Sequence, residues 1–556
     1  MTRVRNMFLA ERGAPIRVQM ISVALIAAFV AILGKGANLA LQPGEVSAVR
    51  ADVFQAEARR ADIVDRNGEL LATSVEVYSL FADPRAIWDA DETAAALAEV
   101  FQDLDVSGLA ARLSNRDRAF VWVRRQLTPR QRQAVFELGL EGLGFRRELR
   151  RAYPRGTLAG HALGYAGVDG NGLSGVEFSQ DERLREGEDP LQLTLHAGVQ
   201  FAVEAELAAA AAIHDIEGGA GLLMHTRTGE VLAVASWPPI NPNRARELDV
   251  DDPARLNRAS TAVYELGSVF KPLTVALALD SGVLHPADTF DVSDPLTIRG
   301  REITDTHPIN GRVTATTIIS ESSNIGTVKV SVLAGVRRLR EFLGELGLFE
   351  RSPIELSGSA APLLPAEWDE LSSATVSYGH GIAVSPVSFL SAYGVLANQG
   401  EYVPPALILD ERRRPQPRRV LSAPTSDLVL AMLREAVVTG TGAQAEVAGY
   451  RVAGKTGTAE KPIAGGYSET ENVNSFAAIF PADRPEYALL IVLDNPKTAA
   501  ETAGGVTGGS TAAWNAAPTA GRVIERVAPI LGIAPKFDTP ALRLQGRSEP
   551  DSRSTL

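Results

Sequence analysis

The sequence predicts a mixed α/β (α+β) fold in which one antiparallel sheet is covered by helices. A strand-like pair at 220–224 and 231–236 is apolar on both sides and is followed by several helical stretches between 262 and 400. Strand-like runs return at 450–458, 475–480 and 487–493. Helices between an opening hairpin and late strands favour a single sheet that buries its faces against those helices. A content of 45% apolar and 22% charged residues also indicates a folded protein.

The start of the chain predicts a membrane anchor. Residues 1–17 hold four arginines against one acid, and 18–33 are apolar except for Gln19 and Ser22. A basic leader before an apolar helix keeps the N-terminus in the cytoplasm and sends the rest across the membrane. We therefore expect a cytoplasmic tail at 1–17, a transmembrane anchor at 18–38 and an exported body. A cleaved signal peptide and a buried core helix are the alternatives, and the absence of an A-x-A site disfavours the first.

Two folded regions are expected in the exported body. Residues 45–215 have a mixed α/β pattern, and a glycine-containing boundary near 216–220 separates them from a second region at 218–535. The polar residues 537–556 are predicted to be disordered. Other expected elements are a strand at 75–81 and helices at 93–101, 129–138 and 512–531.

Composition excludes several classes of function. The formal net charge is -12 and the body of the chain has no basic block, so we expect no nucleic-acid partner. The chain has no cysteine, which excludes disulfides, thiolate metal sites and cysteine nucleophiles. The 7 histidines include no pair at i+3 or i+4, which excludes a zinc site of the H-E-x-x-H kind.

A candidate nucleophile, Ser268, precedes the helical run 273–279. Residues three apart share one face of a helix, so its Oγ can meet the Nζ of Lys271. A serine hydroxyl needs a base, and a lysine serves as one when burial or a second cation lowers its pKa. The N–H groups at the helix start would stabilise a developing oxyanion. Alone, S-x-x-K is a weak signal, because a surface serine and lysine give the same pattern.

A second candidate segment is Ser322-Ser323-Asn324. Its first hydroxyl could relay a proton, and its amide could hold a substrate carbonyl. The alternative is a helix cap, because serine and asparagine are favoured there.

A third candidate segment is Lys455-Thr456-Gly457-Thr458, at the end of a strand-like run. The glycine lets a substrate backbone approach closely, the lysine supplies positive charge, and the threonines supply donors for a carboxylate. Residues 449–456 also match the phosphate-loop pattern G-x-x-x-x-G-K-T. That loop needs a helix directly after it, and the following Gly-Thr-Ala-Glu-Lys-Pro predicts none.

The use of basic residues gives an independent indication. The chain has seven lysines against 48 arginines, and Lys271 and Lys455 are two of the seven. Because only lysine can readily lose its proton, a lysine retained in an arginine-rich chain is a candidate for proton chemistry.

Taken together, S-x-x-K, S-x-N and K-T-G in this order and at these separations are the signature of penicillin-recognising serine acyl-transferases. The chain resembles that superfamily and, within it, the class B penicillin-binding proteins. Residues 60–72 are similar to the family's R-G-x-I-x-D-R-N-G-x-x-L-A box, with Ala61 in place of glycine. Residues 151–156 and 172–177 look like the second and third boxes of its pedestal domain. The resemblance covers roughly 45–530.

The resemblance implies a penicillin-binding/β-lactamase-like transpeptidase domain at 218–535 and a non-catalytic, dimerisation-type pedestal at 45–215. Residues 265–271, 321–324 and 378–381 read more like the cell-division (FtsI-type) branch. The elongation branch, which more often has Pro-Gly before the nucleophile, is the alternative.

The resemblance also implies catalytic roles. Ser268 would attack the D-Ala-D-Ala carbonyl of a peptidoglycan stem peptide, and Lys271 would accept its proton. Ser322, linked to Lys271 and Lys455, would pass that proton to the leaving D-Ala. The amine of a neighbouring stem would then take the acyl group. β-Lactams would leave a stable acyl-enzyme, and no metal or cofactor would be needed.

Substrate-binding roles follow in the same way. Asn324 would orient the acyl amide, and Lys455, Thr456 and Thr458 would hold the terminal carboxylate on the strand that contains Gly457. The backbone N–H groups of Ser268 and Thr458 would form the oxyanion hole.

The family also sets the expected cellular context. The chain would lie in the bacterial inner membrane as a single-pass protein, with its catalytic domain in the periplasm at the division septum. Its expected partners are the septal glycan polymerase and other division-complex membrane proteins. A β-lactamase, a β-lactam sensor and an inactive scaffold are the alternatives. The first is disfavoured because no Glu-x-x-Leu-Asn pattern lies between Asn324 and Lys455.

Overall fold

A computed structural model describes most of the chain. The described residues are 20–21, 23–24, 27–30, 35, 59–410, 416–463, 465–497 and 510–537. The predicted tail at 1–17, most of the predicted anchor at 18–38 and the predicted disordered residues from 538 onward lie outside them. Within the described part of the chain, no helix is both long enough and apolar enough to cross a membrane.

A five-stranded antiparallel sheet lies at the centre of the second region, in the order β14-β15-β16-β6-β7. This arrangement confirms the prediction that an early hairpin and late strands share one antiparallel sheet. β14 is an edge strand, so one side of its backbone is open to another chain. The strands are β6 (Gly218–His225), β7 (Val231–Trp237), β14 (Ala453–Ile463), β15 (Gly466–Phe480) and β16 (Tyr487–Asp494).

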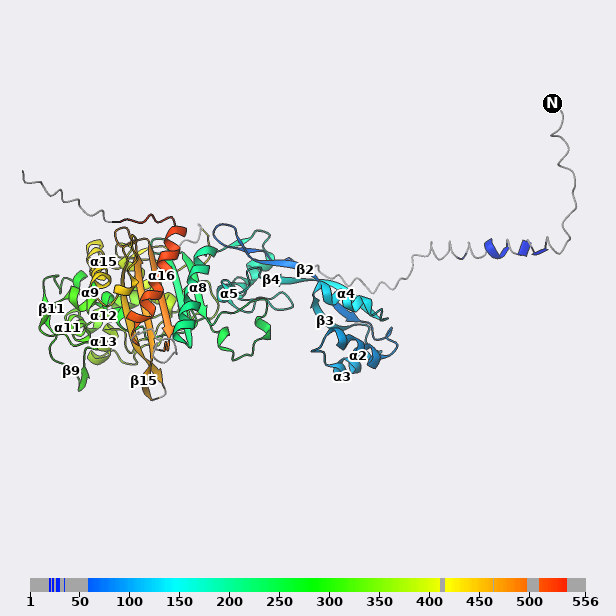
Figure 1. Cartoon of the computed structure of the whole chain (residues 1–556), viewed down its shortest axis with the longest axis horizontal. Coiled ribbons are helices and arrows are strands. Elements are labelled where there is room, and N and C mark those ends of the chain that lie inside the picture. The colour runs from blue at the N-terminus through cyan, green and yellow to red at the C-terminus, as the bar shows by residue number, and fades with distance from the viewer. Residues whose placement is uncertain are drawn as a thin grey trace, which may run out of the picture. The chain divides into compact units, whose positions relative to one another are not determined.

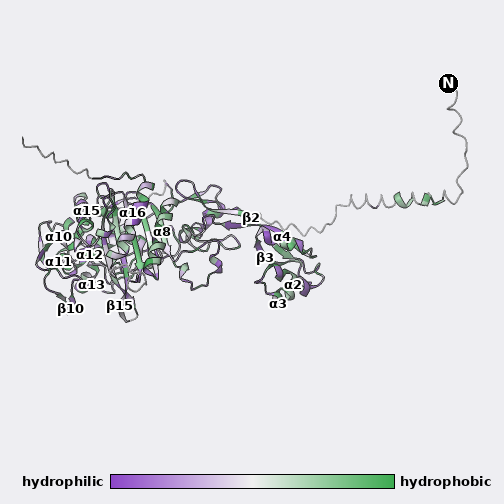
Figure 2. Cartoon of the chain, in the orientation of Figure 1, coloured by the Kyte–Doolittle hydropathy of each residue, from purple (hydrophilic) through white to green (hydrophobic). Residues whose placement is uncertain are grey.

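Helices cover both faces of this sheet (Figure 1). Side chains of β16 alternate between two cores: Leu489 and Ile491 belong to one, and Ala488 and Leu490 to the other. Because both faces are buried there, β6 and β16 are largely apolar, and Figure 2 shows green ribbon in this sheet. α8 (Ala197–His214) and α16 (Ala516–Ile530) pack into the first core, and α9 (Lys271–Asp280), α14 (Pro386–Tyr393) and α15 (Ala423–Val438) into the second.

Shorter elements complete this region. The helices are α10 (Ala315–Ser320), α11 (Asn324–Ala334), α12 (Val336–Glu345) and α13 (Glu370–Ser377). The small strands are β8 (Thr289–Asp291), β9 (Leu296–Ile298), β10 (Arg301–Ile303), β11 (Arg312–Thr314), β12 (Glu401–Tyr402) and β13 (Arg418–Arg419).

The first region, which we call the pedestal, has its own sheet, in the order β3-β2-β1-β5 with β4 also paired to β2. The predicted strand at 75–81 lies within β2, and the two predicted helices correspond to α2 and α4. α4 begins where Thr128 and Gln131 form a capping box and Pro129 occupies the first turn. The strands are β1 (Ile63–Val64), β2 (Leu70–Ala82), β3 (Val121–Leu127), β4 (Leu143–Ala152) and β5 (Leu191–Gln192). The helices are α2 (Ala90–Val100), α3 (Val106–Leu113), α4 (Pro129–Glu137), α5 (Gly160–Leu163), α6 (Gly175–Ser179) and α7 (Asp181–Glu186).

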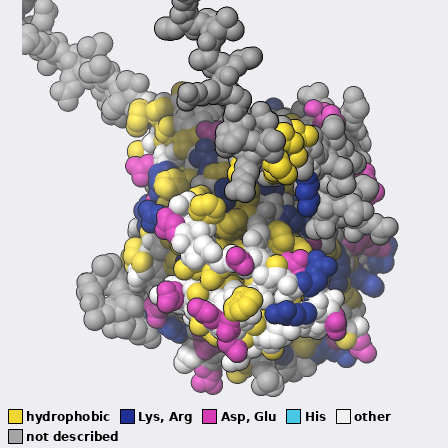
Figure 3. Space-filling view, turned by 90° about the vertical axis from the view of Figure 1, so that its right-hand side faces the viewer, with side chains coloured by type: hydrophobic (Ala, Val, Ile, Leu, Met, Phe, Trp, Pro, Cys, Tyr) yellow, Lys and Arg dark blue, Asp and Glu magenta, His cyan; other side chains and the backbone are white. Residues whose placement is uncertain are grey.

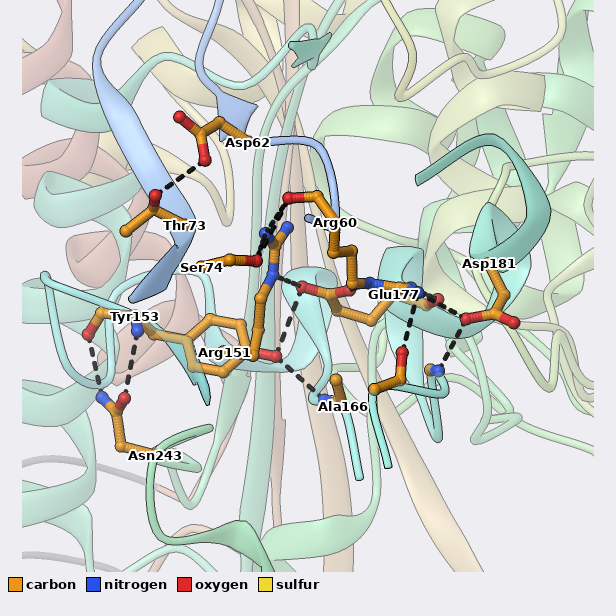
Figure 4. Close-up of polar contacts among 12 residues, drawn as sticks. Arg60, Asp62, Thr73, Ser74, Arg151, Tyr153, Ala166, Glu177, Asp181 and Asn243 are labelled. Carbon is orange, nitrogen blue, oxygen red and sulfur yellow. Dashed lines mark hydrogen bonds and ion pairs between the residues drawn. The ribbon is translucent and has the colours of Figure 1, made fainter. Parts of the chain in front are cut away.

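Buried charges hold the three sequence boxes of the pedestal together (Figure 4). Glu177, which is 0% exposed, pairs with Arg60 at 2.5 Å and with Arg151 at 2.6 Å. Arg60 also pairs with Asp181 at 2.6 Å, and Tyr153 Oη donates to Glu177 at 3.3 Å. The carboxylate of Glu177, from the third box, therefore pairs with one arginine from each of the other two boxes.

Candidate active site

Ser268 lies in a 3-10 turn, Gly267–Phe270, that runs directly into α9. Gly267 has φ +63°, and a Cβ there would meet the Thr458 carbonyl oxygen at 2.9 Å. Glycine therefore lets the nucleophile turn pack directly against β14. Ser268 is partly exposed and lines a cavity of about 580 Å³. The helix start and the edge strand thus both reach the predicted nucleophile.

Lys271 is fully buried beneath this cavity. Its Nζ donates to the carbonyl oxygen of Ser322 and to Ser322 Oγ at 3.1 Å. Burial lowers the pKa of Lys271 well below its usual value, and the positive charge of Lys455 lowers it further. The sequence predicted a contact between Lys271 and Ser268, and in the structure the described hydrogen bonds of Nζ go to Ser322 instead.

Ser322 occupies an unusual backbone conformation between α10 and α11. Its φ is +65°, a left-handed value that non-glycine residues rarely adopt. The next residue, Ser323, caps α11 by accepting from Gly326 N at 2.9 Å. The helix-cap alternative is therefore correct for Ser323, while Ser322 projects toward Lys271.

Asp305 holds this turn in place. One carboxylate oxygen accepts from Ser323 Oγ at 2.7 Å, and the other accepts from the backbone N–H groups of Asn324 and Ile325. Asn324 Nδ2 donates to Thr304 O at 2.9 Å. Asp305 was missed in the sequence because it precedes the motif by nearly twenty residues in an irregular segment.

Lys455 is the second fully buried lysine of the site. Its Nζ donates to Thr456 Oγ1 at 3.1 Å and to Thr441 Oγ1 at 3.4 Å, and the two threonine hydroxyls lie 2.8 Å apart. Burial lowers the pKa of Lys455 to about 7. The predicted link from Lys455 to Ser322 is not among the hydrogen bonds of the described residues. Thr441 was missed because it lies in a Thr-Gly-Thr-Gly run that is typical of a loop.

The strand that carries Lys455 continues to Ile463, so the phosphate-loop alternative is wrong. Gly457 is required by the packing here: a Cβ would meet Leu266 O at 2.2 Å and Ser475 Oγ at 2.4 Å. Thr458 is exposed on the same strand, and its Oγ1 accepts from Ala512 N at 3.1 Å.

The structure thus brings the three predicted segments together around one cavity. Ser268, Ser322, Asn324, Thr456 and Thr458 line it, and the two buried lysines lie behind that lining. A partly exposed serine hydroxyl near a buried lysine of lowered pKa can act as a nucleophile, and an open edge strand can pair with an extended peptide. Within the described ranges, no group of three histidine, aspartate or glutamate side chains is arranged to hold a metal ion.

Comparison with known proteins agrees with this geometry. Residues 219–513 match the penicillin binding protein transpeptidase domain, and residues 55–194 match the penicillin-binding protein dimerisation domain. The chain is 42% identical over 496 residues to the probable peptidoglycan D,D-transpeptidase FtsI of Caulobacter vibrioides, covering 87% of this chain and 83% of that protein. It is 30% identical over 531 residues to the peptidoglycan D,D-transpeptidase FtsI of Escherichia coli K12, covering 90% and 88%.

A solved structure shows the same relationship. The crystal structure of penicillin binding protein 3 from Mycobacterium tuberculosis complexed with ampicillin has a TM-score of 0.68 and 27% sequence identity, and the match covers 87% of this chain and 98% of that one. The chain therefore belongs to the penicillin-binding protein transpeptidase family, among the class B members that carry a dimerisation domain ahead of the transpeptidase domain.

Proposed function

We propose that this chain is a serine peptidoglycan D,D-transpeptidase that forms an acyl-enzyme on Ser268. Ser268 Oγ attacks the carbonyl of the penultimate D-Ala, its proton passes to Lys271, and the bond to the terminal D-Ala breaks. The leaving amine takes a proton through Ser322. The amine of a second stem peptide then attacks the ester, which forms the cross-link and restores the Ser268 hydroxyl.

The single observation that supports this proposal best is the placement of Lys271. It is fully buried, its pKa is lowered by burial and by Lys455, and it donates to Ser322 beside the nucleophile turn. A lysine whose pKa is lowered in this way can accept the serine proton more readily than an ordinary surface lysine.

The proposed substrate contacts use the open edge of β14. Lys455, Thr456 and Thr458 hold the carboxylate of the terminal D-Ala, and Asn324 holds the acyl amide. The backbone N–H groups of Ser268 and Thr458 receive the oxyanion, each being worth about 3–4 kcal/mol by analogy with other acyl-transfer enzymes. We further propose that β-lactams acylate Ser268, which is consistent with the ampicillin complex of the Mycobacterium tuberculosis relative.

We also propose the cellular role of the FtsI-type relatives: a membrane-anchored enzyme with a periplasmic catalytic domain at the division septum. The names of the two relatives support the division branch over the elongation branch. The pedestal would contact the septal glycan polymerase and other division proteins. Trp88 and Phe136 of the pedestal are 90% and 71% exposed, and the face seen in Figure 3 mixes hydrophobic with acidic and basic side chains.

Labelling with a fluorescent penicillin tests the activity. Wild type is expected to hold the label for many minutes on the peptide that contains Ser268, as located by mass spectrometry. Ser268→Ala is expected to take none while remaining folded. A folded wild type that takes no label would contradict the proposal, and rapid turnover of a chromogenic β-lactam would favour a β-lactamase.

A further inference from the structure

Glu321 is a carboxylate of the active-site cavity that has no role in the mechanism above. It directly precedes Ser322, it is exposed, and it lines the same cavity as Ser268. Within the described part of the chain, its carboxylate takes part in no hydrogen bond or ion pair. The cavity therefore contains an anion that is available to bind a positively charged group.

The fold places Glu321 at the end of the cavity where the proposed function puts the carboxylate of the terminal D-Ala. Ser320, the last residue of α10, accepts a hydrogen bond from Thr441 N at 3.1 Å. Thr441 Oγ1 in turn lies 2.8 Å from Thr456 Oγ1. Burial lowers the pKa of Lys455 to about 7, and the charge of Glu321 opposes this effect. Glu321 thus lies beside the lysine and the threonines of the proposed carboxylate site.

The exposed cation Arg301 acts at the other end of the cavity. Arg301 also lines the cavity, on β10. Its charge, after the larger effect of burial, lowers the pKa of His380, and the ring of His380 lies 4.3 Å from that of Tyr467 on β15. Of the charges of Arg301 and Glu321, only that of Glu321 contributes to the pKa of Lys455. Arg301 therefore does not neutralise Glu321.

A carboxylate beside a site for anions calls for a cation on the ligand. Two negative charges close together repel each other, so Glu321 alone would weaken the binding of the donor carboxylate. The reaction supplies the missing cation, because the released D-Ala carries an ammonium group as well as a carboxylate. The acceptor amine enters where that amine leaves, since both bond to the same carbonyl carbon. This step rests on the proposed function, because it uses the proposed position of the donor.

We propose that Glu321 binds the ammonium group of the incoming acceptor and holds it against the acyl-enzyme. The ammonium loses two protons as the C–N bond forms and the ester bond to Ser268 Oγ breaks. One proton returns to Ser268 Oγ through Lys271, and the other passes to solvent. Water is uncharged and gains little from Glu321, so this residue favours transfer to an amine over hydrolysis.

The test uses a donor whose leaving group has no amine, N-benzoyl-D-alanyl thioglycolate. Its acyl-enzyme is offered D-alanine or D-alaninamide, which share the amine and differ in the carboxylate. For each acceptor, chromatography gives the ratio of the amide product to the hydrolysed product at a fixed acceptor concentration. Both products come from one acyl-enzyme, so the ratio does not depend on the rate of acylation.

The variants separate an amine site from an indirect effect on Lys455. Glu321→Gln is expected to lower the ratio about tenfold for both acceptors, as for the loss of one hydrogen bond between charged groups. If Glu321 acted only through the charge of Lys455, the loss would be confined to D-alanine, because D-alaninamide has no carboxylate. Glu302→Gln is the matched control: it removes another exposed acid of the same cavity, on β10, and is expected to keep the wild-type ratio.

Several results would overturn the inference. They are an unchanged ratio in Glu321→Gln, a loss confined to D-alanine, and an equal loss in Glu302→Gln. A wild type that forms the acyl-enzyme but gives only hydrolysis with both acceptors would overturn it as well. Labelling with fluorescent penicillin reports that the site of each variant has folded. Failure of wild type to take that label would instead contradict the proposed function.

Discussion

The pedestal and the active site each bury two basic side chains, but only those of the pedestal have a carboxylate partner. In the pedestal, Arg60 and Arg151 share the carboxylate of Glu177 at 2.5 and 2.6 Å. In the active site, Lys271 and Lys455 are 0% exposed, and within the described part of the chain neither forms an ion pair. The pedestal thus keeps its buried cations charged, whereas the active site makes the charged state of its lysines unfavourable.

The difference shows how one chain separates structural from chemical use of basic residues. An arginine stays protonated under all ordinary conditions and fits a carboxylate with two donors, so it suits a permanent buried pair. A lysine buried without a carboxylate has a lowered pKa. More of it is then in the uncharged form, which can accept a proton as a base. The excess of arginine over lysine in the whole sequence matches this division, because Lys271 and Lys455 occupy positions where arginine could not exchange a proton.

Replacing Lys271 by arginine tests this division most severely. Lys271→Arg introduces a permanent positive charge and removes the proposed base, so the acylation rate with fluorescent penicillin is expected to fall by roughly 10²–10⁴-fold. Lys536→Arg is the matched control, because that exposed lysine pairs with Asp483, and its rate is expected to stay within about twofold of wild type. A Lys271→Arg enzyme that keeps more than a tenth of the wild-type rate would break the comparison.

Removing the buried carboxylate of Glu177 tests whether the ion pairs of the pedestal stabilise its fold. Glu177→Gln leaves Arg60 and Arg151 buried without their shared carboxylate, and the free energy of unfolding in urea is expected to fall by about 3–5 kcal/mol. Acylation of the folded fraction should be unaffected, because Glu177 lies in the pedestal and does not line the cavity. Glu69→Gln, which breaks an exposed pair with Arg155, should lose only about 0–1 kcal/mol. Equal losses of unfolding free energy in the two variants would show that the buried ion pairs contribute no more to stability than an exposed pair.

A smaller effect is expected where a charge positions the site without entering the chemistry. Asp305→Asn replaces the carboxylate that accepts from Ser323 and Asn324, so the turn that carries Ser322 is held less firmly. We expect about a tenfold slower acylation, which corresponds to about 1.4 kcal/mol. Asp288→Asn is a control on the surface loop after α9. If Asp305→Asn matches that control, the left-handed turn at Ser322 does not depend on Asp305.

The sequence was sufficient for the sheet and for the motifs, for different physical reasons. Strands such as 487–493 are buried on both faces and are therefore apolar throughout, which makes them recognisable without a structure. The three motifs were found because their residue types and order are specific. Ser268, Lys271, Ser322 and Lys455 do meet, although the hydrogen bonds join Lys271 to Ser322 and Lys455 to Thr441.

The residues that sequence reasoning missed act through backbone geometry rather than through a motif. Asp305 works because an irregular segment places its carboxylate beneath the start of α11, and Thr441 works because a loop brings its hydroxyl beside Thr456. The convergence of Arg60, Arg151 and Glu177 was also invisible in the sequence, because it depends on how separate segments pack. Such placements follow from tertiary packing, which local patterns do not encode.

The pH dependence of acylation tests the central claim most directly. Lys271 has a lowered pKa, so its base form grows as the pH rises and the rate should rise with it. Lys455 has a pKa of about 7, and in the proposed mechanism it binds the carboxylate in its protonated form, so the rate should fall again at higher pH. Because the two lysines interact, the apparent values belong to the pair.

The account therefore predicts a bell-shaped profile for wild type with fluorescent penicillin, whose maximum lies well below 10.5, the ordinary pKa of a lysine. A rate that keeps rising through that value would contradict it. Such a profile would show that the buried lysine is an ordinary cation, like the arginines of the pedestal.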